Sequence, residues 1–342
     1  MSISRNLLSW PFLAAFLLVA FVSCDKNEKE FFADEELETL MLNNPDGINF
    51  YFLGDGYVKR DLEKSGGQYR QDAVQYMEFL FEKAPFSEFQ DQINFHVIYV
   101  ESAENLSNRP DNGGRDTAFN LEFRDGVLYN FDLDKMIALV QIHFPDFDLF
   151  EERDVILLSL KGGSVAIGGG GIALFPNTSF GLMLHEVGHA FAGLGDEYES
   201  LPGVDYDPSY TYANANLDST GNPELIKWRH FFGVKGYEST GIFEGGGYLS
   251  EGIWRPDQNS VMRYAGDGKE KNFNAPSREA IVRKIMTLSG TEYSFEAFLN
   301  IDRAFIVSEG EAAGKRVSPV EPTGVHEDHN QRLLELINVR AQ

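Results

Sequence analysis

Two histidines and a glutamate in the middle of the chain could together bind and use a metal ion. They form the pattern His185-Glu186-x-x-His189. Residues four apart lie on the same face of a helix, so both imidazoles would point at one ion. Imidazole is a preferred zinc ligand, and Glu186 would act as general base toward a water on that ion. The alternative is a pair of core histidines that bind no metal.

The residues around this pattern predict the helix that it needs. Leu184, Val187 and Phe191 recur at helical spacing, which gives the helix an apolar face to bury. Thr178 and Ser179 are both candidate N-caps. The interpretation of the His-Glu-x-x-His pattern as a metal site therefore has a structural context that a chance occurrence of the pattern would lack.

A zinc site needs at least three protein ligands, and a hydrolase keeps the fourth position for water. Asp196 and Glu197 are the nearest candidates, because they follow directly after the helix would end at Gly193. Both are acceptable zinc ligands by residue type. His230, farther along the chain, is a fallback ligand, with a structural role as its alternative.

A second segment, Asn259–Tyr264, resembles the Met-turn that lies beneath the zinc ion in metzincin peptidases. The resemblance implies that Met262 forms an apolar floor below the ligands, for which its flexible, polarizable side chain is suited. It also implies that Tyr264 assists at the zinc ion or at the oxyanion. The alternative is a core methionine beside a surface tyrosine.

The metzincin pattern also bears on the third ligand, which in those enzymes comes three residues after the glycine that ends the helix. Here that position is Asp196, counted from Gly193. The chain departs from the pattern by one extra residue before the glycine and by Asp in place of His. The resemblance favours Asp196 as the ligand and Glu197 as a residue that orients it.

These motifs together resemble the bacterial immunoglobulin-A-peptidase family of zinc metallopeptidases. The matching segments are His185–Tyr198, Leu53–Tyr57 and Arg255–Arg263, and the resemblance spans residues 48 to 288. It implies a metzincin-like zinc endopeptidase. It does not imply that immunoglobulin A is the substrate.

The apolar patterns predict an α/β (α+β) fold with a twisted mixed sheet covered by helices. Strands are expected at residues 48–53, 93–99 and 154–158, the second half-buried because its apolar residues alternate and the third central because they are continuous. Helices are expected at residues 68–84, 133–143 and 277–288, besides the helix with the two histidines. The metzincin resemblance adds a smaller C-terminal subdomain that contains the Met-turn.

A glycine-rich stretch, Gly168–Gly171, precedes the apolar segment Ile172–Phe175. No Gly-Lys-Ser/Thr sequence follows, which disfavours a phosphate-binding loop. We expect Ile172–Phe175 to be an edge strand above the zinc helix, where a peptide substrate could add as a further strand. Beyond the helix, the segment 202–218 is rich in Asp and Asn, and its sequence allows two interpretations: a calcium site or a plain loop.

The first 24 residues have the composition of a targeting segment: a positive charge, an apolar run and small residues before Cys24. The ending resembles a lipobox, which implies that Cys24 is lipidated and that lipid anchors the protein to the bacterial outer membrane or cell surface. A plain secretory signal and an uncleaved anchor are the alternatives. Cys24 is the only cysteine, so the exported part would contain no disulfide.

The remaining chain divides into a charged tether at residues 25–46, a catalytic domain at residues 47–310 and a polar tail at residues 311–342. A helical tendency is expected in the tether around Glu35–Leu42. The tail contains His326 and His329, which we interpret as solvated residues and not as ligands. The apolar content of 43% is enough for a substantial core.

The leading hypothesis is hydrolysis of peptide bonds in a protein or peptide substrate, with extracellular glycoprotein among the substrate classes. The net charge of −24 disfavours nucleic acid as a partner. One rival is a surface-anchored binding lipoprotein with a structural zinc site, although such a site would not need Glu186. Another is an amidase that acts on cell-wall peptides.

Overall fold

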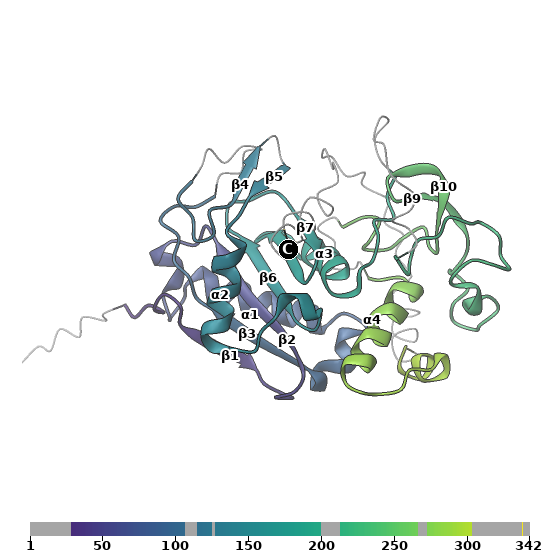
Figure 1. Ribbon diagram of the computed structural model, residues 1–342, viewed down its shortest axis with the longest axis horizontal. Coiled ribbons are helices and arrows are strands. Elements are labelled where there is room, and N and C mark those ends of the chain that lie inside the picture. The colour runs from purple at the N-terminus through teal and green to yellow at the C-terminus, as the bar shows by residue number, and fades with distance from the viewer. Residues whose placement is uncertain are drawn as a thin grey trace, which may run out of the picture.

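A mixed sheet of six strands forms the centre of the computed structural model, which describes residues 29–106, 115–124, 127–199, 213–265, 272–302 and 337. The strands are β1 (Leu37–Met41), β2 (Ile48–Asp55), β3 (Ile93–Ile98), β6 (Val155–Leu160), β7 (Ile167–Gly169) and β8 (Ile172–Pro176). They lie in the order β1-β3-β2-β6-β8-β7 (Figure 1). The four inner strands run parallel, and each edge strand runs antiparallel to its neighbour.

Helices cover both faces of this sheet. The α-helices named in Figure 1 are α1 (Gln68–Phe81), α2 (Leu133–His143), α3 (Phe180–Ala192) and α4 (Ala275–Leu288), and residues 295–302 are helical as well. Phe50 of β2 faces α3, where its ring centroid lies 6.0 Å from that of Phe191, and α1 packs beside α3. Tyr51 points to the opposite face, where it packs 4.9 Å from Phe144 at the end of α2. The mixed sheet with helices on both faces confirms the predicted α/β class.

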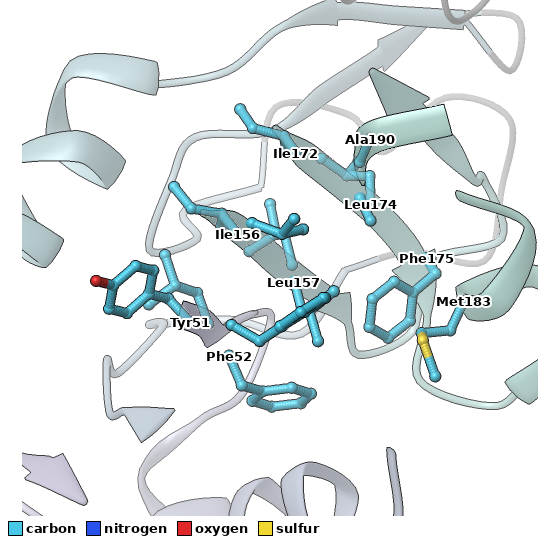
Figure 2. Close-up of a cluster of buried hydrophobic side chains, with 14 of the residues drawn as sticks. Tyr51, Phe52, Ile156, Leu157, Ile172, Leu174, Phe175, Met183 and Ala190 are labelled. Atoms are coloured by element: carbon cyan, nitrogen blue, oxygen red, sulfur yellow. The ribbon is translucent and has the colours of Figure 1, made fainter. Parts of the chain in front are cut away.

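The inner strands are almost continuously apolar, as expected where both faces of a parallel sheet are buried. Figure 2 shows side chains of β2, β6 and β8 packed together with Met183 and Ala190 of α3. The expectation of a half-buried strand at residues 93–99 is wrong, because all six residues of β3 are buried. Its polar members are satisfied by neighbours: His96, for example, bonds to Thr39 and Asn49.

The segment before residue 47 does not have the expected helical tendency. Residues Leu37–Met41 form β1, which pairs antiparallel with β3, and Phe32 is buried in the core beside Tyr99. The sheet therefore includes residues that the sequence assigned to a tether. Cross-strand pairing with a distant segment outweighs the weak local preference for helix.

The glycine-flanked strand is also placed differently from the expectation. Ile172–Phe175 belongs to β8, which pairs with β6 on one side and β7 on the other, so it is an interior strand. The edge strand is β7, which contains Gly168 and Gly169. A Cβ at Gly168 would lie 2.4 Å from the carbonyl oxygen of Glu186. Glycine at this position therefore lets β7 pack directly against α3.

The C-terminal part of the described chain lies on the far side of α3 from the sheet and contains α4 and a hairpin (Figure 1). The hairpin consists of β9 (Phe243–Gly246) and β10 (Leu249–Arg255), and a second hairpin, β4 (Glu122–Arg124) with β5 (Val127–Asn130), belongs to the N-terminal part. Trp228, Phe231 and Phe298 form a separate hydrophobic cluster with α4. Helix α3 thus lies between the sheet and this second cluster.

Several predictions from the sequence concern residues outside the described ranges. These are the targeting segment with Cys24, most of the polar tail, and residues 200–212 of the segment considered for calcium. Across the described residues, no helix is both long and apolar enough to cross a membrane.

Candidate metal centre

Helix α3 carries both histidines of the motif, and its ends are well defined. Ser179 is the N-cap, because its hydroxyl accepts a hydrogen bond from the backbone N–H of Leu182 at 3.3 Å. The helix ends at Gly193, whose φ of +59° is left-handed and therefore favours glycine. Leu184 and Val187 are fully buried and anchor the apolar face. The N-cap and the C-cap thus define the ends of the helix that positions both histidines.

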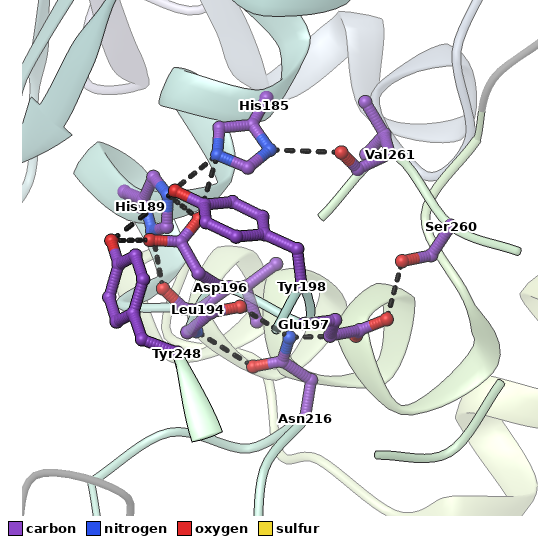
Figure 3. A network of polar contacts seen from close by, with 11 residues as sticks. His185, His189, Leu194, Asp196, Glu197, Tyr198, Asn216, Tyr248, Ser260 and Val261 are labelled. Atoms are coloured by element: carbon purple, nitrogen blue, oxygen red, sulfur yellow. Dashed lines mark hydrogen bonds and ion pairs between the residues drawn. The ribbon is translucent and has the colours of Figure 1, made fainter. Parts of the chain in front are cut away.

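His185, His189 and Asp196 converge on one point (Figure 3). The two Nε2 atoms lie 2.9 Å apart, and Oδ1 of Asp196 lies 2.9 Å from Nε2 of His185 and 3.1 Å from Nε2 of His189. All three side chains are buried. Two imidazoles and one carboxylate gathered this closely are a suitable ligand set for a metal such as zinc. The residues present therefore fit a metal ion.

The far nitrogens of both rings determine which atoms face this point. Nδ1 of His185 lies 2.9 Å from the carbonyl oxygen of Val261, and Nδ1 of His189 lies 2.6 Å from that of Leu194. A carbonyl oxygen only accepts, so each Nδ1–H donates, and the neutral form of each ring would present its Nε2 lone pair to a metal. Backbone geometry thereby selects the ligand tautomer.

Asp196 is ionised in this arrangement. Burial by itself would raise the pKa of its carboxyl group, but the positive charge and N–H donors of protonated His189 and His185, whose own pKa values Asp196 raises in return, hold that pKa well below the usual range. Asp196 therefore supplies a negative charge among the three converging atoms. This is the candidate that the sequence favoured over its neighbour Glu197.

Glu186 is buried next to the first histidine. Burial is the largest effect on its carboxyl group and raises the pKa to about 8, with Asp196 contributing and His185 opposing. Its Oε2 atom has no hydrogen-bond partner among the described residues. A buried carboxyl oxygen without a partner is costly in a folded protein, so Glu186 is a candidate for a functional role.

Glu197 points away from the converging atoms and ties three segments together. Its carboxylate accepts hydrogen bonds from Ser260 at 2.5 Å, Asn216 at 2.8 Å and Asn274 at 2.6 Å. Its backbone N–H donates to the carbonyl oxygen of Met262 at 2.9 Å. Burial raises the pKa of Glu197 to about 7, although the three donors oppose this shift. Glu197 thus orients the ligand segment against the segment that contains Met262, which is fully buried.

We call His185, His189 and Asp196 the ligand group, as candidate metal ligands. Two tyrosines that the sequence analysis did not single out contact it. The hydroxyl of Tyr248 donates to Oδ2 of Asp196, and the hydroxyl of Tyr198 lies 3.3 Å from that of Tyr248 (Figure 3). The ring of Tyr198 stacks near His185, with centroids 6.3 Å apart. The sequence held two signals: Tyr198 directly follows the acidic pair, and Tyr248 follows three successive glycines.

A cavity of about 1040 Å³ opens beside the converging side chains. Its lining includes His189, Asp196 and Tyr248 together with the Gly168–Gly171 segment and residues of α4. This is room for several residues of an extended peptide next to His189 and Asp196.

Comparison with known protein families agrees with the resemblance seen in the motifs. The family model for IgA Peptidase M64 matches residues 42–236, more than half of the chain. The chain belongs to the IgA peptidase M64 family. As a member of this family it is a peptidase, and its substrates are proteins or peptides. A search of curated proteins finds no match.

The family match covers the two histidines, Glu186 and the Asp196–Glu197 pair of this M64 peptidase, and ends before Tyr248 and Met262. Tyr264, the tyrosine that the Met-turn resemblance suggested, packs its ring against the guanidinium of Arg263 at 4.9 Å. Its predicted role at the oxyanion stays a prediction.

His230 is not part of the ligand group. Its Nε2 lies 2.8 Å from Oε2 of Glu279 on α4, so the fallback assignment as a metal ligand is wrong. This pairing across two segments gives His230 the structural role that was the alternative.

Proposed function

We propose that this M64 peptidase is a zinc-dependent endopeptidase in which His185, His189 and Asp196 hold the ion. The convergence of two Nε2 atoms and one ionised carboxylate oxygen at 2.9–3.1 Å carries this proposal. Three protein ligands leave a fourth position for water, as in catalytic zinc sites. When bound there, a zinc ion would lower the pKa of a water molecule and polarise the substrate carbonyl.

Glu186 acts as the general base. A cation beside its carboxyl group favours the ionised form, which offsets the effect of burial on the pKa. Glu186 takes a proton from the attacking water and passes it to the nitrogen of the leaving amine. A C–O bond forms, the C–N bond breaks and no protein nucleophile is required. The Oε2 atom without a partner supports this role, because it can accept that proton without breaking a hydrogen bond.

The arrangement is metzincin-like in this proposal. A long helix carries two ligands, the third follows the glycine at its end, and the Val261–Met262 segment lies below. The hydrogen bond from His185 to the Val261 carbonyl and the bond from Glu197 to that of Met262 support a Met-turn here. The substrate adds along the edge strand β7, which packs against α3 near Glu186.

Incubation of the purified protein and its Glu186→Gln variant with a diverse peptide mixture tests this function, with cleavage read by mass spectrometry. We expect cleavage by the native protein alone, its loss with a chelator and its return with zinc. Glu186→Gln should bind zinc as the native protein does. Cleavage that resists chelation, or a fully active Glu186→Gln variant, would refute the mechanism. Cleavage confined to cell-wall peptides would favour the amidase alternative.

We further propose that lipid on Cys24 anchors the enzyme to the bacterial cell envelope, with extracellular glycoproteins among its substrates. The apolar run that ends at Cys24 supports the anchor. A Cys24→Ser variant should then leave the membrane fraction and fail to incorporate labelled palmitate. An unchanged distribution of this variant between membrane and soluble fractions would contradict the anchor.

A further inference from the structure

The turn of the β9–β10 hairpin lies against the segment that carries the third ligand, although 50 residues separate them. The backbone N–H of Gly247 donates to the carbonyl oxygen of Asp196 at 2.7 Å. The backbone N–H of Tyr248 donates to the carbonyl oxygen of Tyr198 at 3.1 Å. Two backbone hydrogen bonds therefore hold Tyr248 beside the carboxylate.

The two oxygens of Asp196 have different partners. Oδ1 lies 2.9 Å from Nε2 of His185 and 3.1 Å from Nε2 of His189, whereas Oδ2 accepts a hydrogen bond from the hydroxyl of Tyr248. A hydrogen bond on the second oxygen competes with a metal ion for that oxygen and so favours binding through the first. The phenol thereby sets both the orientation and the number of oxygens that Asp196 presents.

The backbone of Tyr248 indicates that its side chain has a role. Its φ is +65°, a left-handed conformation that is strained for a bulky residue. The three preceding residues, Gly245, Gly246 and Gly247, are glycines with positive φ, where no strain arises. A fourth glycine would complete this turn without strain. Tyrosine at this position is explained by the contact that its hydroxyl makes.

Tyr198 completes the arrangement from the other side. Its hydroxyl donates to the hydroxyl of Tyr248 at 3.3 Å, which leaves the Tyr248 hydrogen directed at Asp196. Its ring stacks near His185 at an interplanar angle of 24°. The two phenols thus connect a histidine and the carboxylate of the same ligand group.

We propose that Tyr248 is a positioning residue of the metal centre, which restricts Asp196 to binding the ion through Oδ1 alone and so keeps the fourth coordination position open for water. The proposal rests on the proposed function, because it presumes that these three residues bind zinc. The β9–β10 hairpin lies beyond the segment matched by the family model, and the proposal gives this hairpin a part in metal binding.

Zinc affinity measured by competition with a chromophoric chelator tests this role independently of peptide cleavage. Loss of a residue that orients a ligand typically weakens metal binding about 10- to 100-fold, and we expect this range for Tyr248→Phe. The matched control is Tyr237→Phe, since the Tyr237 hydroxyl donates at 2.8 Å to buried Asp302, outside the ligand group. This control should keep the native zinc affinity.

Two further measurements separate positioning from simple damage to the fold. Tyr248→Gly can adopt the left-handed backbone without strain, and it should bind zinc as weakly as Tyr248→Phe. Its circular dichroism spectrum should match that of the native protein. With cobalt(II) in place of zinc, both Tyr248 variants should lose visible absorption intensity, because a two-oxygen Asp196 raises the coordination number.

The outcomes distinguish this inference from the proposed function. Zinc affinities of the Tyr248 variants within twofold of native, with an unchanged cobalt spectrum, would overturn the positioning role and leave the zinc site standing. Failure of the native protein to bind zinc would overturn the proposed function itself. Equal weakening in Tyr237→Phe would show a general effect of losing a buried tyrosine hydroxyl and would also overturn the proposal.

Discussion

The sulfur of Met262 lies directly against Gly188, the residue before the second histidine of the ligand pair: a Cβ at position 188 would stand 2.7 Å from it. That Cβ would also lie 2.9 Å from the ring of Phe273. Helix α3 therefore carries a glycine where most helices would favour a larger residue, and the close approach lets the buried methionine contact the ligand helix.

Replacement of Gly188 by alanine should destabilise the protein. Alanine is the better helix former by about 1 kcal/mol, but overpacking against Met262 costs about 1–3 kcal/mol, so we expect a net loss in urea unfolding. Met262→Ala makes room for the new methyl group, so the double variant should be more stable than the sum of the single effects. Additive effects would contradict direct packing between the two side chains.

Glu197 should stabilise the fold mainly through the shape of its side chain and its hydrogen-bond acceptor oxygens, and less through its charge. Glu197→Ala leaves the donors of Ser260, Asn216 and Asn274 buried without an acceptor, at about 1–3 kcal/mol each, so we expect a loss of about 3 kcal/mol or more in urea unfolding. Glu197→Gln keeps one oxygen for both amides and offers an N–H to Ser260, so its loss should be much smaller. Equal losses in the two variants would contradict this account.

His96 should make stability depend on pH. Burial holds the pKa of its imidazole down at about 4, while the unfolded chain titrates near 6.5. Below pH 6.5 the unfolded state therefore binds a proton that the folded state does not, and stability falls until about pH 4. From pH 7.5 to pH 5 this contribution is about 2 kcal/mol.

The measurement is urea unfolding of the native protein and a His96→Gln variant at both pH values. The variant should lose less stability on acidification, by about 2 kcal/mol, because glutamine does not titrate. Parallel losses in the two proteins would show that other groups account for the acid sensitivity.

Zinc should raise the temperature of unfolding. At a free zinc concentration 1,000 times its dissociation constant, binding contributes about 4 kcal/mol to the folded state. Differential scanning fluorimetry with zinc and with a chelator measures this shift. Glu186→Gln should show the full shift and His185→Ala should show none, since only the second variant loses a proposed ligand. A shift that survives in His185→Ala would place the ion elsewhere.

Tyr264 provides a contrast with Tyr248. If Tyr264 donates to the oxyanion, Tyr264→Phe should lower kcat by roughly 100-fold while zinc affinity stays at the native value. Tyr248→Phe should change zinc affinity first. Steady-state kinetics with a peptide identified from the mixture, together with the chelator competition, resolves the two effects. An unchanged kcat in Tyr264→Phe would remove that residue from the mechanism.

The ligand helix was predictable from the sequence because its information is local. His185 and His189 share a face of any α-helix, and Gly193 ends that helix three residues before Asp196. The inner strands were predictable for a similar reason, since continuous apolar runs leave few alternatives in a sheet with two covered faces.

What the sequence alone could not determine was set by segments far apart in the chain. The pairing of Leu37–Met41 with β3, the interior place of β8 and the Glu279 partner of His230 all depend on which distant segment lies alongside. Tyr248 reaches Asp196 only because a hairpin folds back onto the ligand segment. The motif thus predicted the candidate metal ligands, whereas tertiary packing decided how they are oriented, because hydrogen bonds between distant residues are not encoded in spacing.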